Sequence, residues 1–236
     1  VSTAADRVCP LPPAREAETR ALLAMLGLPD PQRFSEAAFL DDILNFDPKR
    51  LRLSPADASL LDPEQRLFLD TALRALEDAG RGGTALDNAR VGVFIGGAPD
   101  PMWRTALMRG AAAQRLEQLF VLNVPSNITT RLSFLHNWRG PAALIDTACS
   151  SSLVAIHTAC RALRAGECDW ALAGGAKTIL LPHADGERIS IDSSDGRTHA
   201  FADDADGTGM GEGSAVFLLR PLADALAEGD AIHAVI

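Results

Sequence analysis

One cysteine stands where an apolar run of the sequence meets a helical run. The stretch IDTACSSSLVAIHTACRALRAG covers residues 145–166, and Cys149 lies at its junction. A helix leaves its first N–H groups without intrahelical partners and points the positive end of its dipole at that terminus. A thiolate is stabilised there, and backbone N–H groups at such a turn can hold an oxyanion. The order strand, cysteine, helix therefore indicates a nucleophile elbow built on sulfur.

The other cysteines lack this placement. Cys9, Cys160 and Cys168 form no C-x-x-C pair with one another or with Cys149, and their spacing matches no zinc site. Free cysteines are commonly buried as small hydrophobic residues, so we expect Cys160 in the core. We predict free thiols, no metal site and a reducing, cytoplasmic setting.

A nucleophilic cysteine normally works with a histidine. His157 lies eight residues beyond Cys149, which is about 12 Å along a helix, so it cannot contact the sulfur. The four other histidines have no spacing that implicates them, and we expect them to be structural or exposed: His136, His183, His199 and His233. The sequence thus offers a nucleophile without its acid–base partners.

Strands and helices alternate along the chain. We predict helices over 14–26, 63–80, 102–120, 126–138, 150–165 and 221–229, and strands over 91–97, 142–148, 170–181, 214–220 and from 231 to the end. The apolar, β-branched runs are typical of strands buried on both faces. Alternation of this kind predicts an α/β domain with a largely parallel sheet.

Two helices carry further local predictions. In the helix after the junction, the residues Leu153, Ile156, Cys160 and Leu163 recur at steps of 3, 4 and 3, which predicts one buried face. Ser126 stands where the N-cap of another helix is expected.

Composition limits the possible function. The 236 residues are 47% hydrophobic and 22% charged, and the net charge of −9 makes nucleic acid an improbable partner. No apolar run approaches the ~18 to 20 residues of a membrane span, and the first residues show no signal-peptide pattern.

The last predicted strand has no polar tail, and a β-unit expected before the first helix is missing. We expect the chain to be part of a larger protein.

The segment DTACSSSLVAIHTACRALRAGECDWALAGGA (146–176) resembles the active-site segment of β-ketoacyl synthases, in particular the ketosynthase domains of modular polyketide synthases. Three further stretches are similar to the same family and follow in the same order: 39–80, 91–97 and 195–230. The likeness runs, with gaps, from about Asp6 to the end of the chain.

The resemblance implies a thiolase-like, layered αβαβα fold. Two pseudo-repeated halves each contain a mixed, mostly parallel five-stranded sheet, and two chains form a homodimer. Residues 1–236 would be the first half, lacking the opening strand and the second half, which supplies two catalytic histidines and a lysine. Only Cys149 matches a catalytic residue of the family. We also expect half of such a fold to expose a large apolar face and not to fold alone.

By the same resemblance, Cys149 accepts an acyl chain from the phosphopantetheine arm of an acyl carrier protein. A malonyl group on a second carrier then loses carbon dioxide and attacks the thioester to give a β-ketoacyl chain. The expected partners are acyl carrier protein and other polyketide synthase domains, and the domain itself binds no cofactor. Other readings remain open, namely a non-elongating ketosynthase that only transfers acyl chains, a scaffold without catalysis, and a thiolase using free coenzyme A.

Two other stretches have both a functional and a structural interpretation. GTGMGEG (207–213) is neither a dinucleotide fingerprint nor a P-loop, so we expect a turn that feeds the next strand. The stretch 123–132 resembles a family segment near the dimer interface and acyl channel. Asn123 or Asn127 therefore lines the acyl pocket or, alternatively, serves as an ordinary helix cap.

Overall fold

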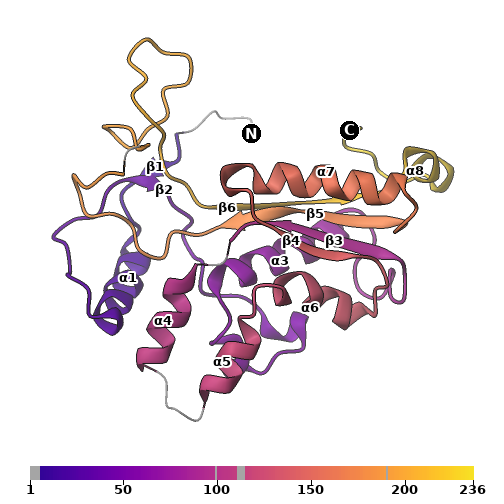
Figure 1. Ribbon diagram of the computed structural model, residues 1–236, viewed down its shortest axis with the longest axis horizontal. Helices are drawn as coiled ribbons and strands as arrows, with labels where there is room; N and C mark the ends of the chain where they lie inside the picture. The colour runs from indigo at the N-terminus through magenta and orange to yellow at the C-terminus, as the bar shows by residue number, and fades with distance from the viewer. Residues whose placement is uncertain (1–5, 99, 111–114, 190) are drawn as a thin grey trace.

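A four-stranded sheet forms the centre of the computed structural model, which describes residues 6–98, 100–110, 115–189 and 191–236 (Figure 1). Its strands lie in the order β4 (Ala142–Ile145), β3 (Val91–Gly96), β5 (Trp170–Lys177) and β6 (Gly213–Leu219). β3 runs parallel to β4 and β5, whereas β6 pairs antiparallel with β5. The predicted α/β class with a largely parallel sheet is confirmed. The sheet contains four strands among the described residues, whereas the resemblance implied five.

Helices cover both faces of this sheet. α7 (Ser151–Arg164) lies on one face, and α3 (Pro63–Asp78) and α6 (Asn127–His136) lie on the other (Figure 1). The remaining elements are β1 (Val8–Cys9), α1 (Pro13–Leu26), β2 (Ala37–Ala38), η1 (Pro48–Leu51), α2 (Pro55–Ala58), α4 (Pro101–Gly110), α5 (Leu116–Leu122), η3 (Ala148–Ser150) and α8 (Leu222–Glu228). Within the described ranges, no helix has the length and apolar character needed to cross a membrane.

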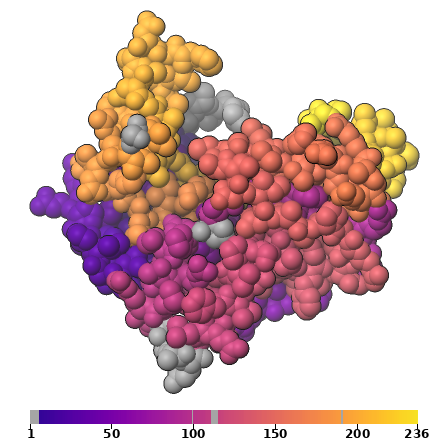
Figure 2. Space-filling model, viewed as in Figure 1, coloured from indigo at the N-terminus to yellow at the C-terminus, as the bar shows by residue number. Residues whose placement is uncertain are grey.

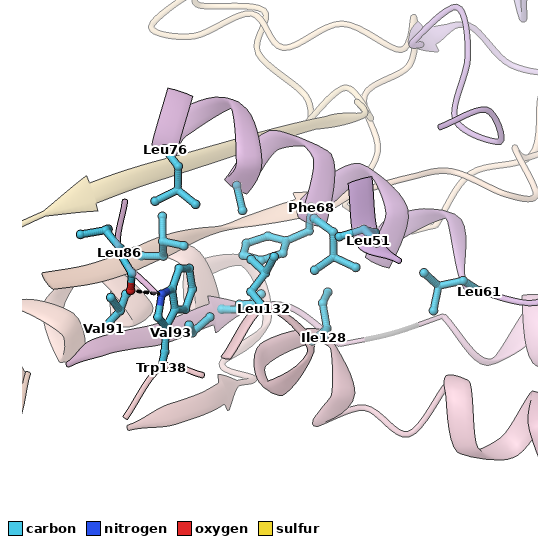
Figure 3. Packing of buried hydrophobic residues seen from close by; sticks show 14 residues of the cluster. Leu51, Leu61, Phe68, Leu76, Leu86, Val91, Val93, Ile128, Leu132 and Trp138 are labelled. Carbon is cyan, nitrogen blue, oxygen red and sulfur yellow. Dashed lines mark hydrogen bonds between the residues drawn. The ribbon is translucent and has the colours of Figure 1, made fainter. Parts of the chain in front are cut away.

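The larger apolar cluster fills the space between the sheet, α3 and α6. Phe68, Leu132 and Val93 of β3 are fully buried members of this cluster (Figure 3). Trp138 closes one end of the cluster, and its indole N–H donates a 3.0 Å hydrogen bond to the carbonyl of Leu86. Buried aromatic N–H groups need such a partner, so this bond lets the indole pack without a desolvation penalty.

The other face is packed by small residues, which differs from the prediction. The buried side of α7 consists of Ser151, Ala155, Ala159 and Ala162, whereas Leu153 is 70% exposed. Of the 3-4-3 set, only Leu153 is exposed, whereas Ile156, Cys160 and Leu163 are half-buried. Ile156 and Leu163 pack against the small-residue cluster, so the set lies beside the buried face rather than forming it. Alanines let the helix approach the sheet closely, which larger side chains would prevent.

Other predictions need smaller corrections. Ser126 occupies the N-cap position of α6, but its side chain makes no capping hydrogen bond. Cys160 is half-buried rather than part of the core. The structure has no strand over 231–236, and the strand predicted over 142–148 ends at 145 and lies half-buried at the sheet edge. The helix predicted over 102–120 is two helices, α4 and α5, and its residues 111–114 lie outside the described ranges.

A long connection between β5 and β6 stands away from the body of the molecule (Figures 1 and 2). A buried ion pair fixes its return to the sheet: Arg15 of α1 is bonded to both carboxylate oxygens of Glu212 at 2.8 and 2.9 Å. The same carboxylate accepts the backbone N–H groups of Leu40 and Ile179. The two side chains are 2% and 0% exposed, so every lone pair must be satisfied by protein.

We predict that Glu212→Ala destabilises the fold by about 3 to 5 kcal/mol, because it removes the hydrogen-bonded counter-ion of buried Arg15. The remaining carboxylate, of the partly exposed Glu18, lies 3.9 Å from the guanidinium. Asp169→Asn is the matched control, since Asp169 pairs with Arg90 at the exposed surface and such pairs contribute little. Denaturant unfolding of the complete domain measures both changes. Equal effects of the two substitutions would contradict a stabilising role for the buried pair.

Candidate functional site

Cys149 lies on a sharp turn between β4 and α7. It sits in η3, the single turn that directly precedes α7, and its side chain is exposed to solvent. Ala148 adopts a left-handed conformation with φ of +54°, which a residue with a Cβ rarely does. The chain therefore turns abruptly at the cysteine, as a nucleophile elbow requires. The positive end of the α7 dipole lies beside the sulfur.

Short hydrogen bonds hold this turn. The hydroxyl of Ser151 accepts the N–H of Thr147 at 2.9 Å and donates to the carbonyl of Ala148 at 2.7 Å. The hydroxyl of Ser150 donates to the carbonyl of Thr147 at 2.8 Å. Asp146 accepts the N–H of Ala148. The serines after the cysteine thus bind the turn and leave the sulfur accessible.

Two glycines of the sheet make room for the start of α7. A methyl group on Gly96 would lie 2.3 Å from the backbone of Ser151 and Ser152. One on Gly175 would lie 2.7 Å from the carbonyl oxygen of Gly96 and 3.3 Å from the Cβ of Ser152. The elbow therefore rests directly on backbone at the carboxyl ends of β3 and β5.

The histidines do not complete a catalytic pair within the described part of the chain. None is hydrogen-bonded to Cys149, and His157 is exposed on α7. His136 bonds Asp87 at 2.7 Å, and the others lie against carboxylates elsewhere: His183 with Asp192, His199 with Asp195, and His233 with Asp78. Cys9 is half-buried and Cys168 is buried. No group of three or more candidate ligands among the described residues could hold a metal ion.

Asn123 and Asn127 both bond to backbone. The buried amide of Asn123 accepts the N–H of Asp62 and donates to the carbonyls of Leu60 and Leu119. Asn127 donates to the carbonyl of Val121. These bonds to backbone fit a structural role for both side chains.

The glycine-rich stretch 207–213 leads into β6, as predicted. A Cβ on Gly207 or Gly209 would clash with backbone of Asp192 and Gly196, so these glycines permit close packing of the long connection. Glu212 in the same stretch forms the buried pair with Arg15. No local pattern indicated that partner, which lies 197 residues away in the chain.

Sequence reasoning missed a buried acidic group near the elbow. The carboxylate of Glu64 lies against Gly97, the residue after β3, and 3.8 Å from the ammonium group of Lys177 at the end of β5. Burial raises the pKa of Glu64 to about 7, and burial likewise raises the pKa of the adjacent N-cap, Asp62, to about 6. Two ionisable groups with shifted pKa values thus lie at the same end of the sheet as Cys149. The glycine pairs 96–97 and 174–175 inside apolar strands were the available signal of close packing there.

We predict that Gly96→Ala displaces the start of α7 and costs about 2 to 3 kcal/mol, because its methyl group meets backbone rather than a movable side chain. Gly213→Ala is the control, since nothing lies within 4 Å of its Cβ position. Unfolding free energy and the rate of Cys149 alkylation by iodoacetamide measure the effect. A Gly96 variant as stable and as reactive as the Gly213 variant would contradict this account.

We predict a pH-dependent stability difference between the wild type and Glu64→Gln. Because the folded-state pKa of Glu64 is raised from 4.5 to about 7, the folded state binds more protons than the unfolded state between these values. Wild-type stability therefore falls as pH rises through this window, by about 3 kcal/mol from this group. Glu64→Gln has no such titrating group. The free energy of unfolding of the variant relative to that of the wild type therefore increases from pH 4.5 to pH 7 and is constant above pH 7.

Unfolding of the complete domain across pH 4 to 8 tests the difference. Lys177→Met is the companion variant. The ammonium group of Lys177 lowers the pKa of Glu64, so its removal raises that pKa further, and the fall in stability continues to higher pH. A wild-type-minus-variant difference that is flat with pH would refute the assignment.

Comparison with known proteins gives the family. The family described as "Beta-ketoacyl synthase, N-terminal domain" matches residues 6–225. The spectinabilin polyketide synthase system protein NorC of Streptomyces orinoci is 40% identical over all of this chain, which spans 10% of that protein. Polyketide synthase GfsA of Streptomyces halstedii is 45% identical over 84% of the chain, which spans 3% of it. The chain is thus a small part of the length of these relatives.

Solved structures agree with this result. The ketosynthase from module 6 of the bacillaene synthase of Bacillus subtilis 168 matches with a TM-score of 0.70 and 35% identity, over 84% of this chain and 34% of that one. An oxazolomycin ketosynthase domain from Streptomyces albus JA3453 matches with a TM-score of 0.72 and 32% identity, over 96% and 40%. The thiolase-like fold expected from the resemblance is therefore confirmed. The chain belongs to the β-ketoacyl synthase family and is similar to the ketosynthase domains of polyketide synthases.

Proposed function

We propose that this chain is the N-terminal half of a chain-elongating polyketide ketosynthase and that Cys149 is its acyl acceptor. The exposed sulfur on the turn before α7 is the observation that supports this proposal most directly. The family match over residues 6–225 and the coverage of only 34% and 40% of two solved ketosynthase chains support the division into halves.

In the proposed first step, the Cys149 thiolate attacks the carbonyl carbon of an acyl thioester on a carrier protein. The bond from that carbon to the carrier's phosphopantetheine sulfur breaks, and the carrier leaves as a thiol. The acyl chain is then a thioester on Cys149. A cysteine suits this step because its thiolate is a strong nucleophile and its thioester stays reactive.

In the second step, a malonyl thioester on another carrier loses carbon dioxide. The electron pair of the broken carbon–carbon bond forms a new bond to the acyl carbonyl carbon, and the Cys149 thiolate is released. The product is a β-ketoacyl chain on the second carrier. We propose that histidines outside this chain stabilise the enolate and the thioester oxygen, since no described histidine is bonded to Cys149.

The proposed partners are acyl carrier proteins, other polyketide synthase domains and a second copy of the same domain. The names of the relatives, a polyketide synthase and a polyketide synthase system protein, support the first two. The carriers bring phosphopantetheine with them, so the proposal requires no cofactor resident in this chain.

We predict that the complete domain gains the mass of an acyl group when it is incubated with an acyl thioester, and that Cys149→Ala abolishes the gain. Cys9→Ala is the matched control, because Cys9 is half-buried in a short strand pair remote from α7 in the chain order. Intact-mass spectrometry reads the adduct. An acyl adduct that persists in Cys149→Ala would refute the assignment of Cys149 as the acyl acceptor.

A second experiment distinguishes chain elongation from acyl transfer without condensation. With malonyl carrier added, the acylated wild-type domain should give a β-ketoacyl carrier and lose its adduct. Acylation followed by no carbon–carbon bond formation would contradict the elongating proposal and support an acyl-transferring domain.

A further inference from the structure

A cavity lies at the opposite end of the sheet from Cys149. It has a volume of about 240 Å³ and lies between η1, the second half of α3 and the end of α6. His136 of its wall accepts the N–H of Asn88 through its carbonyl, just before β3 begins, whereas the elbow rests on the residue where β3 ends. The cavity is therefore separate from the proposed catalytic site.

One cation in this cavity has no anionic partner among the described residues. Arg50 is neutralised, because it bonds Asp70 at 2.7 Å and Glu77 at 2.5 Å. The neighbouring Arg52 lines the cavity, is exposed and forms no ion pair in the described part of the chain. The unsatisfied charge of the cavity is thus the guanidinium of Arg52.

Arg52 also occupies a backbone position that favours glycine. It follows η1 with φ of +52° and ψ of +36°, the left-handed conformation that arginine adopts at some cost in free energy. The conformation itself needs no arginine, because backbone groups end the turn: the N–H of Arg52 donates to the carbonyl of Lys49, and the N–H of Leu53 donates to the carbonyl of Pro48. A strained position that keeps a long cationic side chain points to a role for that side chain.

The rest of the lining defines the chemistry of an occupant. Leu73, Leu76 and Leu135 give the cavity apolar walls. On its rim, the backbone N–H groups of residues 82–84 donate none of the hydrogen bonds found among the described residues. Arginine and free backbone N–H groups bind carboxylates well, and the leucines suit an adjoining apolar side chain.

The net charge of the chain favours a tethered peptide segment over a small anion in solution as the occupant of the cavity. A net charge of −9 repels small anions at long range, and one uncompensated arginine opposes this only locally. A segment of the same polypeptide or assembly needs no such attraction, because tethering supplies a high effective concentration. The relatives NorC and GfsA, of whose length this chain spans 10% and 3%, show that such flanking chain exists in the family.

We propose that this cavity is a docking site for an acidic peptide segment, in which Arg52 binds a glutamate or aspartate carboxylate and the leucines receive the apolar residue beside it. The site holds flanking chain of the synthase against the ketosynthase at the end of the sheet remote from Cys149. It does not depend on the proposed acylation chemistry.

The test uses the full-length polypeptide and the probe peptide acetyl-Glu-Leu-Leu-amide, with acetyl-Gln-Leu-Leu-amide as the neutral match. Hydrogen–deuterium exchange reports protection of residues 82–84 and of any flanking segment that occupies the site. Arg52→Gly removes the cation and relieves the backbone, so we expect it to keep or raise the melting temperature. Asn88→Gly relaxes a second left-handed residue, with φ of +64°, which does not line the cavity.

We expect Arg52→Gly to lower the affinity for the acidic probe by about tenfold. One flanking segment should also become more accessible to hydrogen–deuterium exchange in this variant. Arg52→Lys and Asn88→Gly should change the affinity much less, and Cys149 should acylate normally in all three variants. Equal binding of the acidic and neutral probes, or equal binding by wild type and Arg52→Gly, would overturn the proposal. Protection of residues 82–84 by inorganic phosphate but not by the acidic probe would overturn it in favour of a small-anion site.

Discussion

The contact between the first turn of α7 and the glycines of the sheet is the constraint on which the rest of this structure depends. The backbone of Ser151 and Ser152 approaches Gly96 so closely that no Cβ fits between them. This contact fixes how far α7 stands from the sheet and therefore requires alanines along its buried side. It also fixes where the chain must turn after β4. The exposed position of Cys149 thus depends on this packing as well as on the hydrogen bonds within its own turn.

A second constraint acts through the buried pair of Arg15 and Glu212. Four hydrogen bonds converge on one carboxylate from α1, from residue 40 and from residue 179 just after β5. A buried pair of this kind adds little net stability over an apolar packing, but it is costly to break and it specifies one arrangement. Here it brings a long connection back to β6 in register. The sheet end that supports the elbow is thus fixed from both sides.

The sequence predicted the elements better than their contacts. The strand over 91–97 and the helix over 63–80 were evident, because continuous apolar runs and a proline at a helix start are local signals. The placement of Cys149 between a strand and a helix was also predicted from a local signal. The buried face of α7 was predicted correctly only in part, because its centre consists of alanines, whose small side chains give a weak periodic signal, and the larger apolar residues lie beside it. Glu64 and the Arg15–Glu212 pair could not be found, since their partners are distant in the chain and charged residues ordinarily predict surface.

The outward side of α7 connects packing with chemistry. Leu153 is largely exposed there, and the apolar stripe that it begins continues through Ile156 and Leu163, which are half-buried and pack in part against the cluster beneath α7. If the proposed second half covers this stripe, it encloses Cys149 as well, because the cysteine lies one turn before the helix. Enclosure matters because a helix dipole acts weakly on a group in water and more strongly where solvent is excluded. The apolar residues that stabilise the assembly would therefore also give the thiolate the environment in which the leading end of α7 can act on it.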